Sequence, residues 1–304
     1  MTGLKIDAHH HLWQYNDRDY VWMSGGMDCL RRDFLLPDLE QALGRSGIDG
    51  AVTVQARQSL EETRWLLGLA KRSPIMRGVV GWAPLTDPGV ERSLEEFAAD
   101  PKLRAVRHVL HDEPDDDYML RADFNRGIGL LPRYGLVYDI LIFERHLPQT
   151  LRFVDAHPKQ TFVVDHIAKP RIRDRELSPW QERIRELARR ERVYCKISGM
   201  VTEADWRTWT AADLEPYFDV VLSTFGPRRL MFGSDWPVLN LAADYATWVD
   251  TVGRFLATLS AAEQERIWGE TAMEAYGIGK NCATCAEEGP RGAARVMKSS
   301  RREP

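Results

Sequence analysis

Short apolar segments alternate with amphipathic helical segments along almost the whole chain, and this alternation constrains the fold more than any single motif. The apolar segments have the length and β-branched composition of buried strands. We predict eight strands, at residues 5–11, 50–55, 78–82, 103–108, 136–141, 161–166, 193–198 and 229–235. The predicted helices lie at residues 37–47, 59–71, 90–99, 124–134, 146–157, 179–190, 211–225, 245–259 and 261–276. Alternating strands and helices form parallel sheets with the helices outside, and eight strands close a barrel. The chain is therefore predicted to be an α/β protein, a (β/α)8 TIM barrel with additional C-terminal helices.

The length of the chain fits one such domain. A TIM barrel uses ~250 residues, and the chain has 304. We assign residues 1–280 to the barrel. From residue 281 the chain is rich in Gly, Arg, Ser and Glu without periodicity, which predicts a disordered tail over 281–304. Cys282 and Cys285 in this tail form half of a zinc or redox motif, but the chain has no second Cys pair to complete it.

Charge balance and hydropathy exclude several classes of function. The 41 Lys and Arg residues against 45 Asp and Glu residues give a formal net charge of −4, without a basic stripe before the last dozen residues. A nucleic-acid partner is therefore not expected. No apolar run reaches the ~18 residues that cross a bilayer, and the N-terminus lacks a secretory signal pattern. We expect a cytoplasmic protein without a membrane partner.

The first predicted strand runs into three consecutive histidines. Side chains two positions apart on a strand share a face, so His9 and His11 are expected to point one way and His10 the other. Two imidazoles on one face can bind the same divalent ion, zinc in particular. The alternative is a histidine buried for structural reasons, since His-x-His is a short and common pattern.

Polar residues recur where the other predicted strands end. In a barrel of this kind the C-terminal ends of all strands meet at one mouth. The strand-end residues are His9, His11, Gln55, Trp82, Arg107, His108, Tyr138, Asp139, His166, Lys196, Ser198 and Asp235. An inert core has no use for so many polar groups, so we predict that these strand ends form one site.

Some of these residues have the chemistry of a hydrolytic centre. The candidate metal ligands are His9, His11, His166 and Asp235. The Asp235 carboxylate would take a proton from an attacking water while a metal or an imidazolium such as His166 polarises a carbonyl. Arg107 and Lys196 would bind an anionic or hydroxyl-rich substrate and stabilise an oxyanion. The alternative for these two cations is a pair of buried salt bridges.

The predicted substrate pocket combines aromatic walls with a few directional polar groups. Trp13, Trp82 and Trp236 would pack against the C–H face of a small ring, while Gln55 would bind its polar edge. This combination suits a sugar-like ligand. Residues 14–32, which are aromatic and polar without periodicity, predict a substrate loop. For each tryptophan taken alone, a structural role is the alternative.

Five motifs in this order resemble those of the amidohydrolase-related family, in its sugar-lactonase group. The motifs are Asp7–Trp13, Arg107–His108, Val164–Pro170, Cys195–Gly199 and Gly233–Pro237, within a match over roughly residues 4 to 278. The group includes L-fuconolactonase, L-rhamnonolactonase and the 2-pyrone-4,6-dicarboxylate lactonases. Five motifs in the family's order are specific for the family and much less specific for the substrate.

The resemblance implies a distorted TIM barrel in which Asp235 activates water for attack on a lactone carbonyl. The implied function is hydrolysis of the lactone ring of a small sugar acid, such as L-fucono- or L-rhamnonolactone. A metal-dependent decarboxylase on the same barrel is the alternative, and a sugar-acid-binding protein without chemistry is a third hypothesis. The expected cofactor is one divalent metal, zinc first, and metal-free catalysis stays open. The expected partner is a small-molecule sugar lactone or a related organic acid, and a homodimer stays open.

Overall fold

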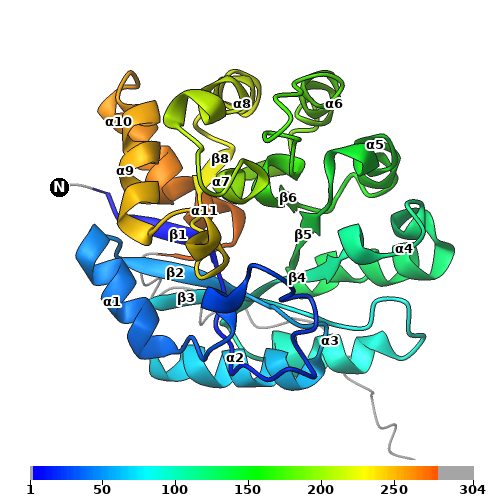
Figure 1. Cartoon of the computed structure of the whole chain (residues 1–304). Coiled ribbons are helices and arrows are strands. Elements are labelled where there is room, and N and C mark those ends of the chain that lie inside the picture. The colour runs from blue at the N-terminus through cyan, green and yellow to red at the C-terminus, as the bar shows by residue number, and fades with distance from the viewer. Residues whose placement is uncertain (1–2, 280–304) are drawn as a thin grey trace, which may run out of the picture.

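The structure, a computed structural model, describes residues 3–279 of the chain. Its centre is one sheet of eight parallel strands, each paired with the next along the chain, and the helices surround this sheet (Figure 1). The strands are β1 (Ile6–His10), β2 (Gly50–Val54), β3 (Met76–Gly81), β4 (Leu103–Val109), β5 (Val137–Leu141), β6 (Phe162–Val164), β7 (Val193–Ile197) and β8 (Leu230–Phe232). This arrangement confirms the predicted α/β barrel. The tail predicted over 281–304, with Cys282 and Cys285, lies outside the described residues.

Helices follow the strands on the outside of the barrel. They are α1 (Leu36–Ser46), α2 (Leu60–Arg72), α3 (Val90–Ala98), α4 (Ala122–Ile128), α5 (Leu147–Ala156), α6 (Trp180–Leu187), α7 (Met200–Glu203), α8 (Ala211–Phe225), α9 (Tyr245–Leu256), α10 (Ala261–Glu265) and α11 (Thr271–Ala275). Ser59 caps α2 by accepting the Glu62 N–H at 3.2 Å, and Gly47 ends α1 in the left-handed region with φ 65°. Among residues 3–279, no helix is both long and apolar enough to cross a membrane.

Two predicted helices differ from the structure. The segment 124–134 covers most of α4 and then a 3-10 turn at Leu131–Tyr134, because Pro132 lacks the N–H that a continuous helix needs. The segment 261–276 contains a π-helical turn, Arg266–Glu270, between α10 and α11. Gly269 in this turn lies against Leu4 so closely that a Cβ would overlap the Leu4 carbonyl oxygen.

The barrel closes by an irregular junction between β1 and the segment after β8. The Asp235 N–H donates to the His9 carbonyl at 2.7 Å, and the His11 N–H donates to the Trp236 carbonyl at 2.7 Å. These bonds surround a single parallel bridge between His10 and Trp236. The backbone of the histidine motif is therefore fixed directly to the backbone around Asp235.

One residue of β1 is extra in its pairing with β2. Asp7 pairs with Ala51, but His10 rather than His9 pairs with Thr53, so β1 contains a bulge between Asp7 and His10. A bulge re-aims the side chains that follow it and is common beside active sites. His10 turns to β2, where its Nε2 lies 2.8 Å from Thr53 Oγ1.

Two buried hydrophobic clusters hold the barrel together. The larger cluster lies between the strands and the helices. The smaller cluster occupies alternate strand positions, such as Val52 and Val54 of β2, and includes Tyr276 and Ile278 after α11. The segment after α11 therefore packs against the apolar end of the barrel interior. The polar strand ends gather at the opposite end.

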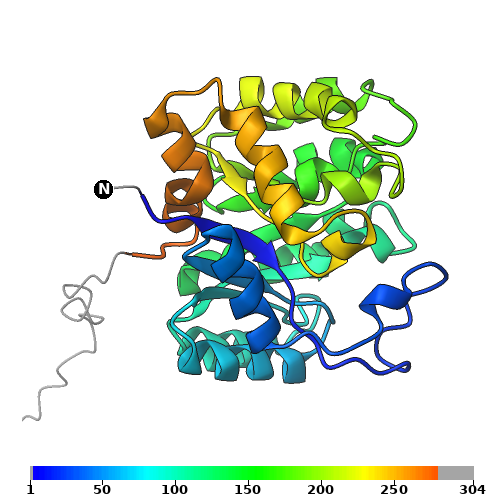
Figure 2. The same cartoon turned by 60° about the vertical axis from the view of Figure 1, so that its left-hand side comes forward.

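The segment between β1 and α1 forms a long loop with one short 3-10 turn, Asp28–Leu30. It projects from the barrel at the end opposite the N-terminus, in dark blue in Figure 2. Val21 and Trp22 in this loop are 77% and 36% exposed. The loop has the position expected for a substrate loop at the mouth of the barrel.

Glu62, in the first turn of α2, ties this helix to the loop after β2. Its Oε2 accepts the backbone N–H groups of Ala56 and Arg57 at 3.1 and 2.8 Å. Burial raises the pKa of the Glu62 carboxyl to about 7. The unfolded chain releases this proton near pH ~4.3, so the proton bound in the folded state stabilises the fold at low pH.

We expect the Glu62→Gln variant to gain stability relative to the wild type as pH rises. Protonated Glu62 makes its full contribution to the free energy of unfolding below about pH 4. This contribution of about 3 kcal/mol is lost as the pH passes about 7. Urea unfolding of both proteins between pH 4 and pH 8 measures it. Glu61→Gln, one position away on the exposed side of the same turn, is the control and should show no such gain. A pH-independent difference for Glu62→Gln would contradict the prediction.

Candidate active site

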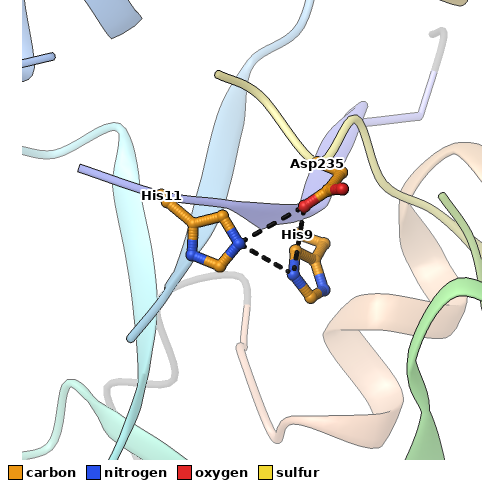
Figure 3. Close-up of side chains that lie close together, drawn as sticks. All are labelled: His9, His11 and Asp235. Atoms are coloured by element: carbon orange, nitrogen blue, oxygen red, sulfur yellow. Dashed lines mark hydrogen bonds and ion pairs between the residues drawn. The ribbon is translucent and has the colours of Figure 1, made fainter. Parts of the chain in front are cut away.

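Three side chains from the two sides of the β1–β8 junction point toward one another (Figure 3). His9 Nε2 lies 3.3 Å from His11 Nε2 and 3.7 Å from Asp235 Oδ1, and His11 Nε2 lies 3.3 Å from Asp235 Oδ1. All three residues are buried, with no more than 5% exposed. The expectation that His9 and His11 share a face, with His10 on the other, is confirmed.

This trio fits a divalent ion such as zinc in spacing and in chemistry. Ligand atoms around a tetrahedral ion with bonds of ~2.1 Å lie about 3.4 Å apart, close to the separations among these three residues. The His11 Nδ1 lies 2.8 Å from the Val54 carbonyl, so this nitrogen carries the proton and Nε2 has a lone pair. The Nε2 lone pair and the Asp235 carboxylate repel each other, and a cation bound between them would attract both. The residues present therefore fit one metal ion.

His166 reaches the trio from a left-handed turn rather than from a strand. The strand predicted over 161–166 ends at Val164, and His166, Ile167, Ala168 and Lys169 all have positive φ, from 46° to 63°. Each such residue costs about 1–2 kcal/mol relative to right-handed backbone, and strain of this kind gathers at functional sites. The turn sets the His166 Nε2 3.9 Å from Asp235 Oδ1 and the His166 Nδ1 2.9 Å from Ser198 Oγ.

Gly199 makes room for the His166 ring. It has a φ of 66°, and a Cβ built there would lie 2.6 Å from His166 Nδ1. It lies two residues after the end of β7, so the segment after β7 and the turn after β6 fit against each other. Only glycine fits both the backbone conformation and the space at this position.

The ionisation of the site follows from burial and from its close neighbours. Burial alone would raise the pKa of the Asp235 carboxyl, but the surrounding imidazoles, His166 first, hold it well below its usual range. Burial lowers the pKa of His166 to about 4, against the effect of the carboxylates nearby. At neutral pH the site therefore contains an ionised Asp235 beside a neutral His166.

A buried charge network lies beneath His9. The Lys196 ammonium lies 2.6 Å from Asp139 Oδ2, 2.9 Å from Asp165 Oδ1 and 3.2 Å from His9 Nδ1. Arg107 Nη1 donates to Asp165 Oδ2 at 2.9 Å. Burial would raise the pKa of Asp165, but Lys196, His9 and Arg107 lower it well below its usual range. Both cations are thus partners of buried carboxylates.

A cavity of about 310 Å³ opens above the trio. It is lined by His11, Trp13, Trp22, Met27, Ala56, Arg107, Val109, His111, Asp112, Leu141, His166, Lys169, Thr202, Glu203, Trp206, Asp235, Val238 and Leu241. Among the predicted site residues, it brings together His11, His166 and Asp235 with Arg107 and Trp13. Residues that follow the ends of β1, β6 and β8 therefore share one cavity, as the sequence predicted.

Other predicted site residues lie behind this lining. Gln55 holds Arg107, whose Nη2 donates to the Gln55 Oε1 at 3.1 Å. Trp82 Nε1 donates to His108 Nδ1 at 3.3 Å, away from the cavity. Lys196 is fully buried within the charge network, and Trp236 packs edge-on against Phe34 at 5.3 Å between ring centroids. The structure therefore places these four residues around the cavity wall rather than on it.

Sequence reasoning did not single out several residues that line the cavity. His111 and Asp112 follow β4, Lys169 follows His166 by three positions, and Glu203 ends α7. Lys169 lies inside the motif Val164–Pro170, which was the one available signal. The others lie in a 3-10 turn and at the end of a short helix, and their position at the cavity depends on long-range packing.

Comparisons with known proteins support the resemblance drawn from the five motifs. A family model described as "Amidohydrolase" matches residues 6–278. The chain is 41% identical over 289 residues to the L-fucono-1,5-lactonase of Burkholderia multivorans, covering 91% of this chain and 97% of that protein. It is 37% identical over 281 residues to the L-fucono-1,5-lactonase of Burkholderia ambifaria, covering 90% and 96%.

A solved structure with a metal ion has the same fold. The crystal structure of an amidohydrolase from Burkholderia multivorans with bound zinc matches this chain with a TM-score of 0.88 at 42% identity, covering 91% of this chain and all of that one.

We expect Gly199→Ala to destabilise the protein more than Gly135→Ala. Gly135 has a φ of 65° but open space around its Cβ position, so the two variants share the backbone penalty and differ in the clash with His166. The difference should be about 1–3 kcal/mol, the usual cost of overpacking. Urea unfolding in the presence of a chelator measures it. Equal losses would mean that the His166 ring does not depend on Gly199.

Proposed function

The chain belongs to the amidohydrolase family, and we propose that it hydrolyses the lactone ring of a small sugar acid. The observation that carries the proposal is the position of the Asp235 carboxylate beside the His9 and His11 imidazoles, a group that could hold a metal ion, with Asp235 and His11 lining a small cavity. L-Fucono-1,5-lactone is the first candidate substrate, because two relatives at 37–41% identity are L-fucono-1,5-lactonases. These relatives favour lactone opening over the decarboxylase alternative.

In the proposed reaction, Asp235 is the general base. It takes a proton from a water molecule whose oxygen attacks the lactone carbonyl carbon. The tetrahedral intermediate collapses by breaking the bond to the ring oxygen, and Asp235 returns its proton to that oxygen. The products are the hydroxyl and the carboxylic acid of the opened sugar acid.

The low pKa of Asp235 keeps the base ionised but makes it weak. A weak base needs a more acidic water, and a divalent ion, when bound, would lower the pKa of water and polarise the lactone carbonyl. We propose that His9, His11 and Asp235 hold this ion, with zinc as the first candidate. The zinc in the related structure supports this choice.

The remaining side chains would bind and orient the substrate. The Arg107 guanidinium lies on the cavity wall, where it can donate to the oxyanion of the intermediate. The His166 Nε2 is the second candidate donor to this oxygen. Trp13 offers an apolar face for the ring, while Gln55 and Lys196 act through Arg107 and His9 as positioning residues. Trp82 would act through His108, behind the cavity wall.

Replacing Asp235 by Asn should lower the rate of lactone hydrolysis by about 10²–10⁴-fold, because a general base contributes a factor of this size. Acid release from a panel of sugar lactones, followed with a pH indicator, measures the rate. Asp219→Asn, on the exposed surface of α8, is the matched control and should keep the wild-type rate. Equal rates for Asp235→Asn and the wild type would end the proposal. Release of carbon dioxide from aromatic acids without lactone turnover would favour the decarboxylase.

Protein purified without chelator or metal-affinity steps should contain one zinc-like ion per chain by elemental analysis. His11→Ala should lose most of this metal, because it removes one of three ligands. His157→Gln is the control, since His157 pairs with Asn125 on the outside of the barrel. A metal-free wild type with full activity would mean that the imidazoles act without an ion.

A further inference from the structure

The wall of the cavity combines charged and apolar residues. Above the floor, the segments after β1 and β8 contribute apolar residues to the lining, namely Trp13, Trp22, Met27, Val238 and Leu241. The charged groups above the floor come from the segment after β4, from the left-handed turn after β6 and from α7. Val109 and Trp206 add apolar surface next to these charged groups, so a ring bound here would meet both apolar surface and charged groups.

Lys169 and Glu203 form an ion pair on the charged side. Lys169 Nζ lies 3.1 Å from Glu203 Oε1, and the two side chains are 18% and 20% exposed. The Lys169 ammonium also lies 5.5 Å from the ring centroid of Phe143, which covers it from one side. We call these two residues the Lys169–Glu203 pair.

The backbone fixes Lys169 relative to the reacting centre. Lys169 ends the left-handed turn that also carries His166, and its N–H donates to the His166 carbonyl at 2.8 Å. The same turn therefore supplies one residue at the floor of the cavity and one on its wall. A substrate whose carbonyl lies at the floor could therefore present ring substituents to Lys169 on the wall.

The backbone also fixes Glu203, at the end of the short helix α7. The Glu203 carbonyl accepts the Arg173 N–H at 2.9 Å. Within α7, Thr202 Oγ1 donates to the Gly199 carbonyl at 2.8 Å, and Trp206 Nε1 donates to the Thr202 carbonyl at 2.8 Å. These bonds support the backbone of α7 around Glu203, and the Glu203 carboxylate itself is placed by its contact with Lys169.

The pair has unused hydrogen-bonding capacity. An ammonium has three N–H donors, and a carboxylate has about four acceptor positions. Within residues 3–279, Lys169 Nζ and the Glu203 carboxylate make no ion pair or hydrogen bond except with each other. An isolated pair of this exposure contributes little to folding stability. Both groups line the cavity, so their free donors and acceptors are available to a ligand there.

We propose that the Lys169–Glu203 pair binds neighbouring hydroxyl groups of the substrate ring and so selects polyhydroxylated lactones. The inference rests on the proposed lactone hydrolysis and adds the residues that determine specificity. A hydroxyl group both donates and accepts, so one of two adjacent hydroxyls can donate to Glu203 while the other accepts from Lys169. Apolar residues of the lining, Trp13 among them, can then cover the C–H face of the ring.

Steady-state kinetics on two six-membered lactones test the proposal. L-Fucono-1,5-lactone carries hydroxyl groups and δ-valerolactone carries none. Glu203→Gln and Lys169→Met should each lower kcat/KM for L-fucono-1,5-lactone about 10–100-fold, mainly through KM, because each removes a charged hydrogen bond. Both variants should stay within about threefold of the wild type on δ-valerolactone. Lys169→Arg, which keeps the charge and the donors, should recover part of the loss.

Glu96→Gln is the matched control. It breaks the exposed pair between Arg64 on α2 and Glu96 on α3, outside the cavity. This variant should change kcat/KM for neither lactone. Equal losses on both lactones for the pair variants would overturn the proposal, because the pair would then support the reacting centre instead of the hydroxyl groups. Unchanged kinetics on both lactones would also overturn it.

A wild type that hydrolyses neither lactone would contradict the proposed function. In that case, measurements of ligand binding test the Lys169–Glu203 pair. Calorimetric titration compares L-fuconate, which carries the hydroxyl groups, with 5-hydroxypentanoate, which lacks the ring hydroxyls. A wild-type preference for L-fuconate that Glu203→Gln removes would support the pair. A preference that survives this change, or no preference in the wild type, would overturn it.

Discussion

A single buried carboxylate, Asp7, joins the first strand of the barrel to the segment after the last one. Its Oδ1 accepts the N–H groups of His9 and Ser234 at 3.0 and 2.9 Å, and its Oδ2 accepts the hydroxyls of Ser234 and Tyr245 at 2.6 and 2.9 Å. Burial raises the pKa of Asp7 to about 6, against these bonds. The relative position of His9 and Asp235 depends on this residue, since each lies within two positions of an Asp7 partner.

The charge network beneath His9 gives the same site a rigid base. Lys196, Arg107, Asp139 and Asp165 are almost completely buried, and opposite charges face each other in pairs. Buried pairs of this kind add little net stability, because desolvation offsets their attraction, but removing one partner is costly. The network therefore serves the geometry of the site more than the stability of the barrel. Tyr276, after α11, donates to Asp139 at 2.8 Å and links the C-terminal helices to it.

The sequence was sufficient for the architecture and for the centre of the site. Strand–helix alternation predicts the barrel because it depends on local periodicity, and the two-residue spacing of His9 and His11 predicts their common face for the same reason. The left-handed turn at His166 could not be predicted, because its residues gain nothing locally from positive φ and are held there by tertiary packing. Whether a strand-end residue reaches the cavity also depends on its neighbours. Lys196 is drawn into the network by Asp139 and Asp165, and Gln55 is held by Arg107, so neither lines the cavity.

The irregular junction between β1 and β8 has a thermodynamic consequence. Every other pair of neighbouring strands is joined by a ladder, whereas this junction has one bridge, the two backbone hydrogen bonds around it and the contacts of Asp7. An ion held by His9, His11 and Asp235 would connect β1 to the segment after β8. Its binding free energy would therefore add to the stability of the closed barrel. Resistance to unfolding and occupancy of the centre would then rise and fall together.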